Sequence, residues 1–334
     1  MARPTLEAVA ERAGVSRATA SRVVNGGGSV REALRERVNR AVQELGYVPN
    51  RAARSLVTRR HDAVAVVVAE SEDRVFSDPF FAQQLRGISA ELTAADVQVV
   101  LLMARSGDFS KIARYLAGGY VDGAVVFSLH QGDALPSIAQ NLGLPTVYGG
   151  RPDWAEGDEV LYVDSDNRGG ARSAVEHLVA AGRRRIATIT GPLDQTAAVD
   201  RLRGYQDALP DADPALIAEG DFTPEGGRQA MAELLARRPG LDAVFAASDL
   251  MASGALRVLR ERGLRVPEDI ALVGFDDVDT VAPWTDPPLT TVHQDIEGMG
   301  RLMARLLLRS LGEDGGNAVA PVITPTRLVV RNSA

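Results

Sequence analysis

Three short helical patterns, separated by turn residues, fill the first 46 positions of the chain. Apolar residues recur there at the spacing of one helix face, which predicts helices over residues 6–13, 17–24 and 30–45. The residues predicted to cap or end these helices are Thr5, Gly14, Ser16, the run 25–28, Ser29 with Glu32 as a capping box, and Gly46. Two short helices joined by a tight turn and braced by a third predict a helix-turn-helix unit.

From residue 63 onward, apolar runs alternate with longer helical patterns. The runs predict strands at 64–69, 97–102, 122–127, 145–149, 186–190, 242–247, 270–275 and, near the end, 327–331. Helical patterns fill the gaps, for example at 81–94, 167–181, 224–237 and 250–262. This alternation predicts an α/β body with parallel sheets and a ligand at the carboxyl ends of the strands. The pattern runs through two similar halves, with passages between them near 163–170 and 289–295.

A short segment, residues 48–61, connects the two parts. Pro49 stops the preceding helix, and Asn50 can cap a new helix that is too short to be stable alone in water. We expect this segment to become ordered only on DNA and beside a second copy of the chain. Leu56 then suits a wedge between base pairs in the minor groove. The alternative is a plain linker in which Leu56 packs on the body.

Charge is distributed unevenly along the chain. The formal net charge is −7, but twelve arginines against five glutamates give residues 1–60 about +7 and leave about −14 for the remainder. A basic unit of this kind binds phosphates, whereas the acidic body should repel DNA. The alternative, a three-helix protein-interaction module with a solvated arginine face, accounts less well for the charge.

Composition and motifs argue against several other classes of protein. The chain has no cysteine, which excludes disulfides and fits a reducing cytoplasm. We find no apolar run that suits a signal peptide or a membrane span. The four histidines form no metal motif, and GxSxG, P-loop and GxGxxG motifs are absent. We therefore expect a cytoplasmic protein, nucleoid-associated when bound to DNA, with no metal, cofactor or catalytic residue; a sugar-processing enzyme is the remote alternative.

DNA recognition is predicted for the second helix, whose N-terminal residues would enter the major groove. Arg17 can donate two hydrogen bonds to O6 and N7 of guanine, whereas Ala18 offers only a methyl contact. The other residues of this part predicted to contact DNA are Thr5, Ser16, Thr19, Ser21, Arg22 and Asn25.

This part of the chain resembles the LacI/GalR family of bacterial transcription regulators. The matching runs are VSRATASRVVN at 15–25 and YVPNRAARSL at 47–56. The resemblance implies a homodimer on a pseudo-palindromic operator in double-stranded DNA, with paired hinge leucines opening a central CpG step. The chain lacks terminal heptads of the kind that make tetramers, which also favours a dimer. The implied DNA contacts fall here on Arg17, Ala18, Arg22, Asn50, Ala53 and Leu56.

The body resembles the periplasmic-binding-protein type I fold, in which two α/β lobes enclose a ligand cleft. We accordingly expect a helix-turn-helix domain at 1–47, a hinge at 48–61 and an effector-binding domain at 62–334. Within that domain the first lobe is expected at about 62–162 and 293–321, and the second at about 163–292 and 322–334.

Polar and aromatic side chains follow many of the predicted strands, where such a cleft would lie. These strand-end positions are 77–81, 149–151, 191–195, 221–222, 248–249 and 276–277. Carboxylates and arginines can hold vicinal hydroxyls while aromatic rings cover an apolar sugar face, so the set suits a neutral polyhydroxyl ligand. The structural alternative is that Asp78 and Asp249 cap helices and that Phe81 belongs to the core.

With the family resemblance, the candidate effector contacts are Phe80, Phe81, Arg151, Gln195, Arg201, Phe222, Ser248, Asp249 and Asp276. Gln195 stands where the purine repressor has a ligand-binding arginine, which disfavours a purine corepressor. Longer runs, such as YLAGGYVDGAVVFSLH at 115–130, resemble actinobacterial regulators that respond to cellobiose and short cello-oligosaccharides. The expected function is a repressor of carbohydrate-utilisation genes that a small sugar effector releases from its operator. A purine- or protein-corepressed regulator is the alternative.

Overall fold

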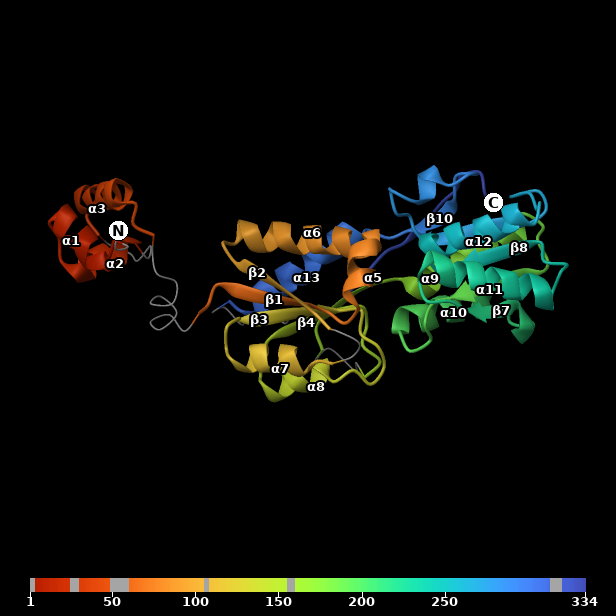
Figure 1. Ribbon diagram of the computed structural model, residues 1–334, viewed down its shortest axis with the longest axis horizontal. Coiled ribbons are helices and arrows are strands. Elements are labelled where there is room, and N and C mark those ends of the chain that lie inside the picture. Colours follow the sequence, from red (N-terminus) through yellow and green to blue (C-terminus); the bar gives the residue numbers. More distant parts are fainter. Residues whose placement is uncertain (1–3, 25–29, 49–59, 105–107, 155–159, 313–319) are drawn as a thin grey trace. The chain divides into compact units, whose positions relative to one another are not determined.

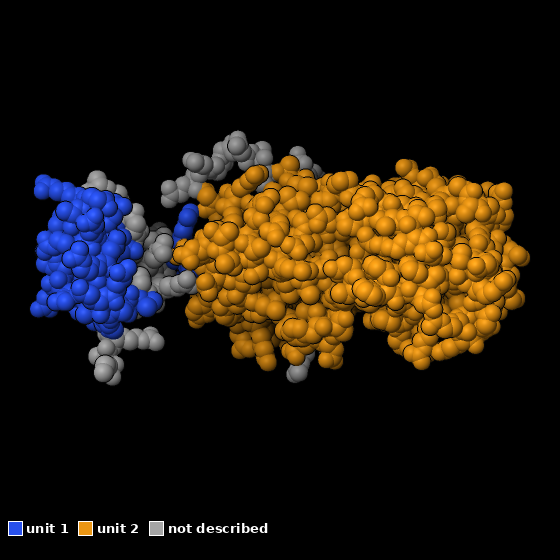
Figure 2. Space-filling view, turned by 90° about the horizontal axis from the view of Figure 1, so that it is seen from above, with its two compact units in different colours: residues 1–61 blue, residues 62–334 orange. Residues whose placement is uncertain are grey.

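The computed structural model describes residues 4–24, 30–48, 60–104, 108–154, 160–312 and 320–334. The chain divides into two compact units, residues 1–61 and 62–334, which Figure 2 shows in different colours. Four residues predicted to contact DNA, Asn25, Asn50, Ala53 and Leu56, lie outside the described residues, as does most of the predicted hinge.

The described part of the smaller unit contains three helices: α1 (Leu6–Ala13), α2 (Arg17–Val24) and α3 (Glu32–Leu45). Val9, Ala20 and Val38, one from each helix, are fully buried where the helices pack together. Thr5 caps α1 by accepting a hydrogen bond from the Ala8 amide, and Ser16 accepts one from the Thr19 amide at 3.1 Å. The predicted inward faces and the first two caps are therefore confirmed.

The start of α3 differs from the prediction. The helix begins at Glu32, and Arg31 in the N-cap position provides no side-chain hydrogen bond. A helix capped by Ser29 would begin at residue 30, so the predicted capping box is wrong. The buried residues Val38 and Ala41 hold α3 against its neighbours without this cap. A missing cap costs only about 1 kcal/mol by comparison.

The first sheet of the body has the strand order β11-β5-β4-β3-β1-β2, and its paired strands are parallel. Its strands are β1 (Ala63–Val68), β2 (Gln98–Met103), β3 (Gly123–Phe127), β4 (Thr146–Gly149), β5 (Tyr162–Ser165) and β11 (Val322–Thr324). The helices of this lobe are α5 (Glu72–Ser77), α6 (Pro79–Ala94), α7 (Ser110–Ala117), α8 (Leu135–Asn141) and α13 (Ile296–Ser310). Figure 1 shows α6 and α13 on one face of the sheet and α7 and α8 on the other.

Successive residues of β1 enter different cores. Val64 and Val66 pack with α6 and α13, whereas Ala63 and Ala65 pack with α7 and α8. Neighbouring side chains on a strand point to opposite faces, so a strand covered on both faces needs an apolar residue at every position. This requirement explains the uninterrupted run AVAVVV, every residue of which is buried.

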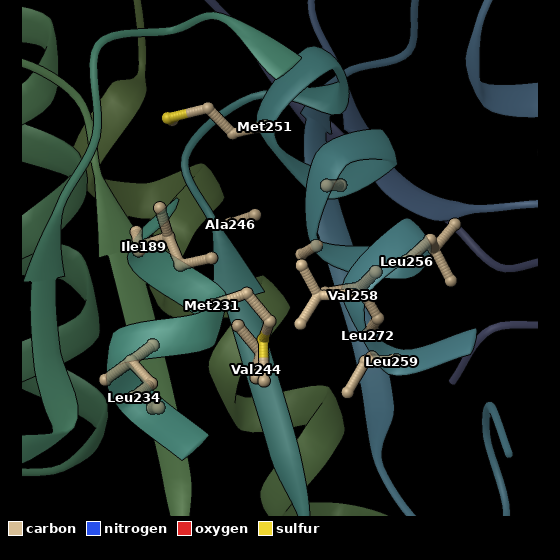
Figure 3. Close-up of a cluster of buried hydrophobic side chains, with 14 of the residues drawn as sticks. Ile189, Met231, Leu234, Val244, Ala246, Met251, Leu256, Val258, Leu259 and Leu272 are labelled. Carbon is tan, nitrogen blue, oxygen red and sulfur yellow. The ribbon is translucent and has the colours of Figure 1, made fainter. Parts of the chain in front are cut away.

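The second sheet has the strand order β12-β10-β9-β8-β6-β7, with β12 antiparallel to β10. Its strands are β6 (Ile186–Thr190), β7 (Ile217–Glu219), β8 (Ala243–Ala246), β9 (Ala271–Asp276), β10 (Thr290–His293) and β12 (Arg327–Val329). The helical elements are α9 (Asn167–Ala180), α10 (Thr196–Ala208), η1 (Pro214–Leu216), α11 (Pro224–Arg237), α12 (Asp249–Glu261) and η2 (Ala282–Trp284). One core lies against α9 and α10, and Figure 3 shows the other, where Met231 of α11 and Leu259 of α12 pack on Val244 of β8.

The chain crosses between the sheets after β5, after β10 and after β11. The lobe boundaries expected from the sequence differ at each crossing. Residues 163–165 and 322–324, expected in the second lobe, form β5 and β11 of the first sheet, where Val163 pairs with Val322. His293, expected in the first lobe, ends β10 of the second sheet. Strands β5, β7, β10 and β11 were not predicted. Each has only three or four residues, too few to show a period, and polar residues interrupt or end the apolar run in each of them.

Helices α6 and α13 approach closely because glycines face each other where they cross. A Cβ at Gly87 would overlap the carbonyl oxygen of Glu297 and lie 3.0 Å from the Arg301 nitrogen. A Cβ at Gly300 would likewise overlap the Gln84 carbonyl oxygen. Any side chain at either position would therefore push the two helices apart.

We expect Gly87→Ala to lower the stability of the body by about 1–3 kcal/mol, because the added methyl group overpacks the helix crossing. Helix propensity alone predicts the opposite sign, since alanine in a helix interior is favoured over glycine by about 1 kcal/mol. Urea unfolding of the two proteins measures the difference. Ser89→Ala, on the exposed side of α6, is the control and should change stability little. A stabilised Gly87→Ala protein would show that the close approach imposes no constraint.

Candidate functional site

The strand order fixes where a ligand can bind. In the first sheet β1 lies between β2 and β3, and in the second β6 lies between β7 and β8. The direction in which successive strands are added to the sheet reverses beside β1 and beside β6. At such a point a crevice forms at the carboxyl ends of the parallel strands. The loops after β3 and β6 meet there, since the Gln131 amide donates to the Asp194 carbonyl oxygen at 2.8 Å.

A cavity of about 710 Å³, open solvent at its mouth included, lies between these strand ends. Residues of both lobes line it, among them Phe127 at the end of β3, Asn167 of α9 and Gln294 after β10.

Seven of the nine predicted effector contacts line this cavity: Phe80, Phe81, Gln195, Arg201, Phe222, Ser248 and Asp276. Arg151 lines an adjoining cavity instead. Asp249 lines neither, which differs from the prediction. Its fully buried carboxylate accepts hydrogen bonds from Thr291 Oγ1 at 2.5 Å and from the Val278 amide at 2.8 Å. Asp249 therefore stabilises the turn after β9 through its bond to the Val278 amide.

Several lining residues also have the structural roles that the sequence left open. Asp78 caps α6 by accepting a hydrogen bond from the Phe80 amide at 2.9 Å. Ser248, rather than Asp249, caps α12. Phe81 is almost completely buried and belongs to the core beneath α6 while it lines the cavity. Capping and packing thus hold these side chains in place for a ligand.

Arg201 on α10 has the densest set of contacts in the cavity. Its Nε donates to Asn167 Oδ1 at 2.9 Å, and its Nη1 donates to the Ala247 carbonyl oxygen at 2.5 Å. Nη1 also lies 3.3 Å from Asp276 Oδ1, and the guanidinium carbon is 3.7 Å from the centre of the Phe275 ring. Such pairing is what a buried charge requires, and it fixes the guanidinium at the bottom of the cleft.

Asp276, the last residue of β9, shares its Oδ1 between Arg201 and Gln294, whose Nε2 donates to it at 2.7 Å. Burial raises the pKa of Asp276 to about 7, although the charge of Arg201 opposes this change. The carboxyl group of Asp276 can therefore accept a hydrogen bond from a ligand hydroxyl or, when protonated, donate one.

Three non-glycine residues of the lining have a positive φ: Ser128 at 61°, Phe222 at 62° and Asp276 at 107°. This backbone conformation costs about 1–3 kcal/mol for a residue with a side chain, and residues that adopt it are concentrated at functional sites. The ring of Phe222 lies 5.6 Å from the guanidinium carbon of Arg74 and 5.8 Å from that of Arg201. The strained turn at Phe222 thus places an aromatic ring between two cations.

Hydrogen bonds connect the two lobes beside the cavity. The His130 ring nitrogens contact Glu70 Oε1 at 3.3 Å and Asp194 Oδ2, in the second lobe, at 2.9 Å. Gln195 Nε2, also in the second lobe, donates to Glu70 Oε1 at 3.2 Å. The hydrogen bond to Glu70, and then that to Asp194, outweighs partial burial and raises the pKa of His130 to about 9. At neutral pH His130 is therefore a cation held between two carboxylates.

Charges in the lining favour an uncharged ligand. The carboxyl groups of Asp78, Asp164 and Asp276 outnumber the guanidinium groups of Arg74 and Arg201. Asp276 already pairs with Arg201. A phosphate or carboxylate ligand would have to compete with Asp276 for Arg201, whereas hydroxyl groups can bond with both kinds of side chain.

Three buried polar atoms of the lining lack a hydrogen-bond partner among the described residues, and one of them is Ser165 Oγ. The other two are Gln84 Oε1 and Arg74 Nε. Arg74 Nε lies 3.7 Å from Glu70 Oε1, which is too far for a hydrogen bond. Buried polar atoms are nearly always satisfied, so these three are available to a ligand.

The sequence missed several residues that the cleft brings together: Glu70, Arg74, Gln84, Ser128, His130, Asn167 and Gln294. Glu70 and Ser128 directly follow predicted strands, so the strand-end rule includes them. Gln84 is a polar residue at a buried helix position between Phe81 and Ile88, which is itself a signal. Arg74 has no such signal, because only the fold brings it to the Asp221 carbonyl oxygen, 2.7 Å away.

The second candidate site is the exposed face of α2. Arg17, Ala18 and Arg22 are exposed along it, as the prediction of DNA contacts requires. Arg17 Nε donates to Glu7 Oε1 at 2.6 Å, and both side chains remain mostly exposed. An exposed ion pair contributes little, so Arg17 can exchange Glu7 for another acceptor at small cost.

Within the described residues, no helix combines the length and apolar character that crossing a membrane requires. The same residues contain no group of three or more histidine, aspartate or glutamate side chains suited to hold a metal ion.

Two family profiles match the chain. The profile "Bacterial regulatory proteins, lacI family" matches residues 5–50, and "Periplasmic binding protein-like domain" matches residues 175–334. With the helix-turn-helix unit and the two parallel-sheet lobes, these matches define a transcriptional regulator with a ligand-binding body. The chain belongs to the LacI family, which confirms the resemblance seen in its sequence.

Individual relatives support this assignment. The chain is 52% identical to the HTH-type transcriptional regulator CelR of Thermobifida fusca, over 99% of this chain and 98% of that protein. It is 34% identical to the ribose operon repressor of Escherichia coli K12, over 99% of each. A solved CelR–cellobiose complex is similar with a TM-score of 0.80 and 49% identity, covering 99% of this chain and 100% of that one.

A lac repressor dimer bound to operator and the anti-inducer ONPF is similar with a TM-score of 0.87 and 30% identity, covering 99% of each chain. These relatives are transcriptional regulators, so the expectation that the chain is not an enzyme is confirmed.

We expect His130→Gln to destabilise the body at pH 7 and to matter much less at pH 10. The pKa of His130 is higher in the folded protein than its usual value of 6.5. Its contribution is therefore fully present below pH 6.5 and is lost as the pH rises through about 9. Thermal unfolding of both proteins at the two pH values measures this difference. His177→Gln on α9 is the control, and an equal deficit of His130→Gln at both pH values would contradict the expectation.

Proposed function

We propose that the protein is a dimeric repressor of carbohydrate-utilisation genes and that a small cello-oligosaccharide-like sugar releases it from its operator. Residues 1–47 bind operator DNA, residues 48–61 form the hinge, and residues 62–334 bind the sugar. The protein acts in the cytoplasm on chromosomal DNA. The observation that carries this proposal is the acid-rich, partly aromatic cavity between the lobes, in a chain 49% identical to a regulator solved with cellobiose.

The chemistry of the cavity supports a neutral sugar. Carboxylates, guanidinium groups and amides supply donors and acceptors for vicinal hydroxyls, and Phe80 and Phe222 supply apolar surface for a sugar ring. Gln195 stands where a purine-binding arginine is expected and bonds to Glu70 instead. This contact weakens the case for a purine corepressor.

The proposed coupling uses the two lobes as a switch. A sugar between them favours the closed arrangement, and two closed bodies in a dimer hold their hinge segments apart. Hinges that are held apart cannot pair in the minor groove near a central CpG step, so operator affinity falls. A ligand shifts such an equilibrium only by its difference in affinity for the two states, typically about 1–3 kcal/mol. The sign of the response follows the resemblance to sugar-responsive regulators.

The test is calorimetry of the full-length protein with cellobiose, cellotriose, glucose, maltose, hypoxanthine and fructose 1,6-bisphosphate. We expect binding of cello-oligosaccharides, no binding of the anionic bisphosphate, and release of operator DNA by the bound sugar in a fluorescence-anisotropy titration. Binding of hypoxanthine alone, with tighter operator binding, would establish the purine-corepressed alternative. Binding of none of these ligands would refute the proposed effector.

We expect Asp276→Asn to weaken sugar binding about 10- to 100-fold while operator binding persists, because a hydrogen bond to a charged group is worth about 1.5–3 kcal/mol. Asp277→Asn is the matched control. The carboxylate of Asp277 bonds to His293 and Arg331 and lies outside the cavity lining. Equal loss in both variants would indicate a general defect of the turn after β9 and would remove Asp276 from the effector site.

We expect Arg17→Ala to relax base preference at one position of each operator half-site, at a cost of about 1–3 kcal/mol for the preferred base pair. Competition binding with a set of singly substituted operators measures this preference. Arg12→Ala, which removes an exposed arginine of α1 paired with Glu44, should leave base preference unchanged. A uniform loss over all sequences in Arg17→Ala would mean that Arg17 contacts only phosphate.

A further inference from the structure

A second cavity adjoins the one between the strand ends. It encloses about 470 Å³, open solvent included, and shares five lining residues with the first: Ser128, Gly149, Gly150, Gln195 and Ala197. The shared wall therefore comes from the ends of β3 and β4 and from the start of α10. We call the first the inner cavity and the second the outer cavity.

Gly150 contributes no side chain to the shared wall. Its φ is +91°, and a Cβ at this position would have no neighbour within 4 Å. The conformation favours glycine, because L residues rarely adopt it. A chain of sugar rings can therefore pass over Gly150 from one cavity to the other without meeting a side chain there.

The outer cavity presents an aromatic ring. Trp154 is 40% exposed, and its ring meets that of Tyr148 at 5.7 Å and 87°. In such an edge-to-face contact Tyr148 covers at most one face of the indole. An indole with a free face in a small cavity is suited to stack against the apolar face of a pyranose ring.

The polar groups around Trp154 fall into two sets. The charged side chains nearest the shared wall are already paired, Arg151 with Asp200 at 2.6 Å and His130 with Asp194 at 2.9 Å. In contrast, the Asp153 carboxylate and the Gln131 side-chain amide are exposed and have no hydrogen-bond partner among the described residues. One free carboxylate and one free amide beside an indole suit hydroxyl groups and do not suit an anion.

We infer that the outer cavity is a second sugar subsite, which takes the ring or rings of an oligosaccharide beyond the ring held in the inner cavity. This inference rests on the proposed function, because it assumes a sugar in the inner cavity. Trp154 comes from the first lobe and Thr196 from the second, so a ligand that reaches the outer cavity contacts both lobes there. A longer sugar thus gains affinity and also adds to the preference for the closed arrangement. The outer cavity makes the protein respond to oligosaccharides in preference to glucose.

The first test compares glucose, cellobiose and cellotriose by calorimetry of the full-length protein. We expect Trp154→Ala to weaken binding of the longer sugars about tenfold and to leave glucose binding unchanged. Trp284→Ala is the matched control, since Trp284 is the other tryptophan of the chain, is 81% exposed and lines neither cavity. A loss for cellotriose alone also supports the subsite and assigns it to the third ring. An equal effect of Trp154→Ala on all three sugars, or none on any, overturns it.

The second test monitors the outer cavity through the fluorescence of Trp154. Trp284→Phe leaves Trp154 as the single tryptophan. We expect its emission to shift with cellobiose or cellotriose and to stay constant with saturating glucose. Emission that never responds, although calorimetry shows that the sugars bind, contradicts the outer subsite and leaves the proposed function intact. The absence of any sugar binding by the wild-type protein refutes both.

Discussion

The cleft depends on one buried guanidinium group. Arg201 reaches the bottom of the cavity from α10, and a charge in that position is tolerated only with full pairing. Its partners come from three other elements: Asn167 on α9, the Ala247 carbonyl oxygen after β8, and Asp276 at the end of β9. The positions of these three partners depend on one another, because the loss of any one leaves the buried charge of Arg201 partly uncompensated. The geometry of the second lobe's half of the site therefore follows from the need to satisfy Arg201.

The two lobes are joined by a different kind of contact. Each lobe has apolar cores on both faces of its sheet, so each is stabilised mainly from within. Beside the cleft the lobes meet through polar pairs, such as Arg74 with the Asp221 carbonyl oxygen and Arg151 with Asp200. Polar pairs at a partly solvated boundary contribute less free energy than the apolar cores, because water can replace them. A ligand that bonds to both lobes can then decide their arrangement, as a regulator requires.

Much of the fold could be predicted from the sequence. Helices α1 and α2 match the prediction, and the long apolar runs are strands, because burial on both faces leaves no polar position in them. The strands that the sequence failed to predict have a common cause for that failure. Strands β5 and β11 are three or four residues long, and they pair with each other although they lie far apart in the chain. A segment of that length carries no periodicity, so its pairing, and with it the lobe boundary, is decided by tertiary contacts.

The residues of the candidate site also separate into those that the sequence predicts and those that only the tertiary structure reveals. The sequence by itself determined the family, the basic DNA-reading unit and seven lining residues of the cavity, because these depend on local motifs and on side chains that follow strands. Only the tertiary structure placed Asp249 beneath the cleft and brought Arg74, Gln84 and Gln294 into it. The physical reason is that a motif records which residues stand near each other along the chain. A carboxylate such as Asp249 can bind a ligand only if its oxygens do not already accept hydrogen bonds within the protein. The residues that donate those bonds to Asp249 lie far from it in the sequence.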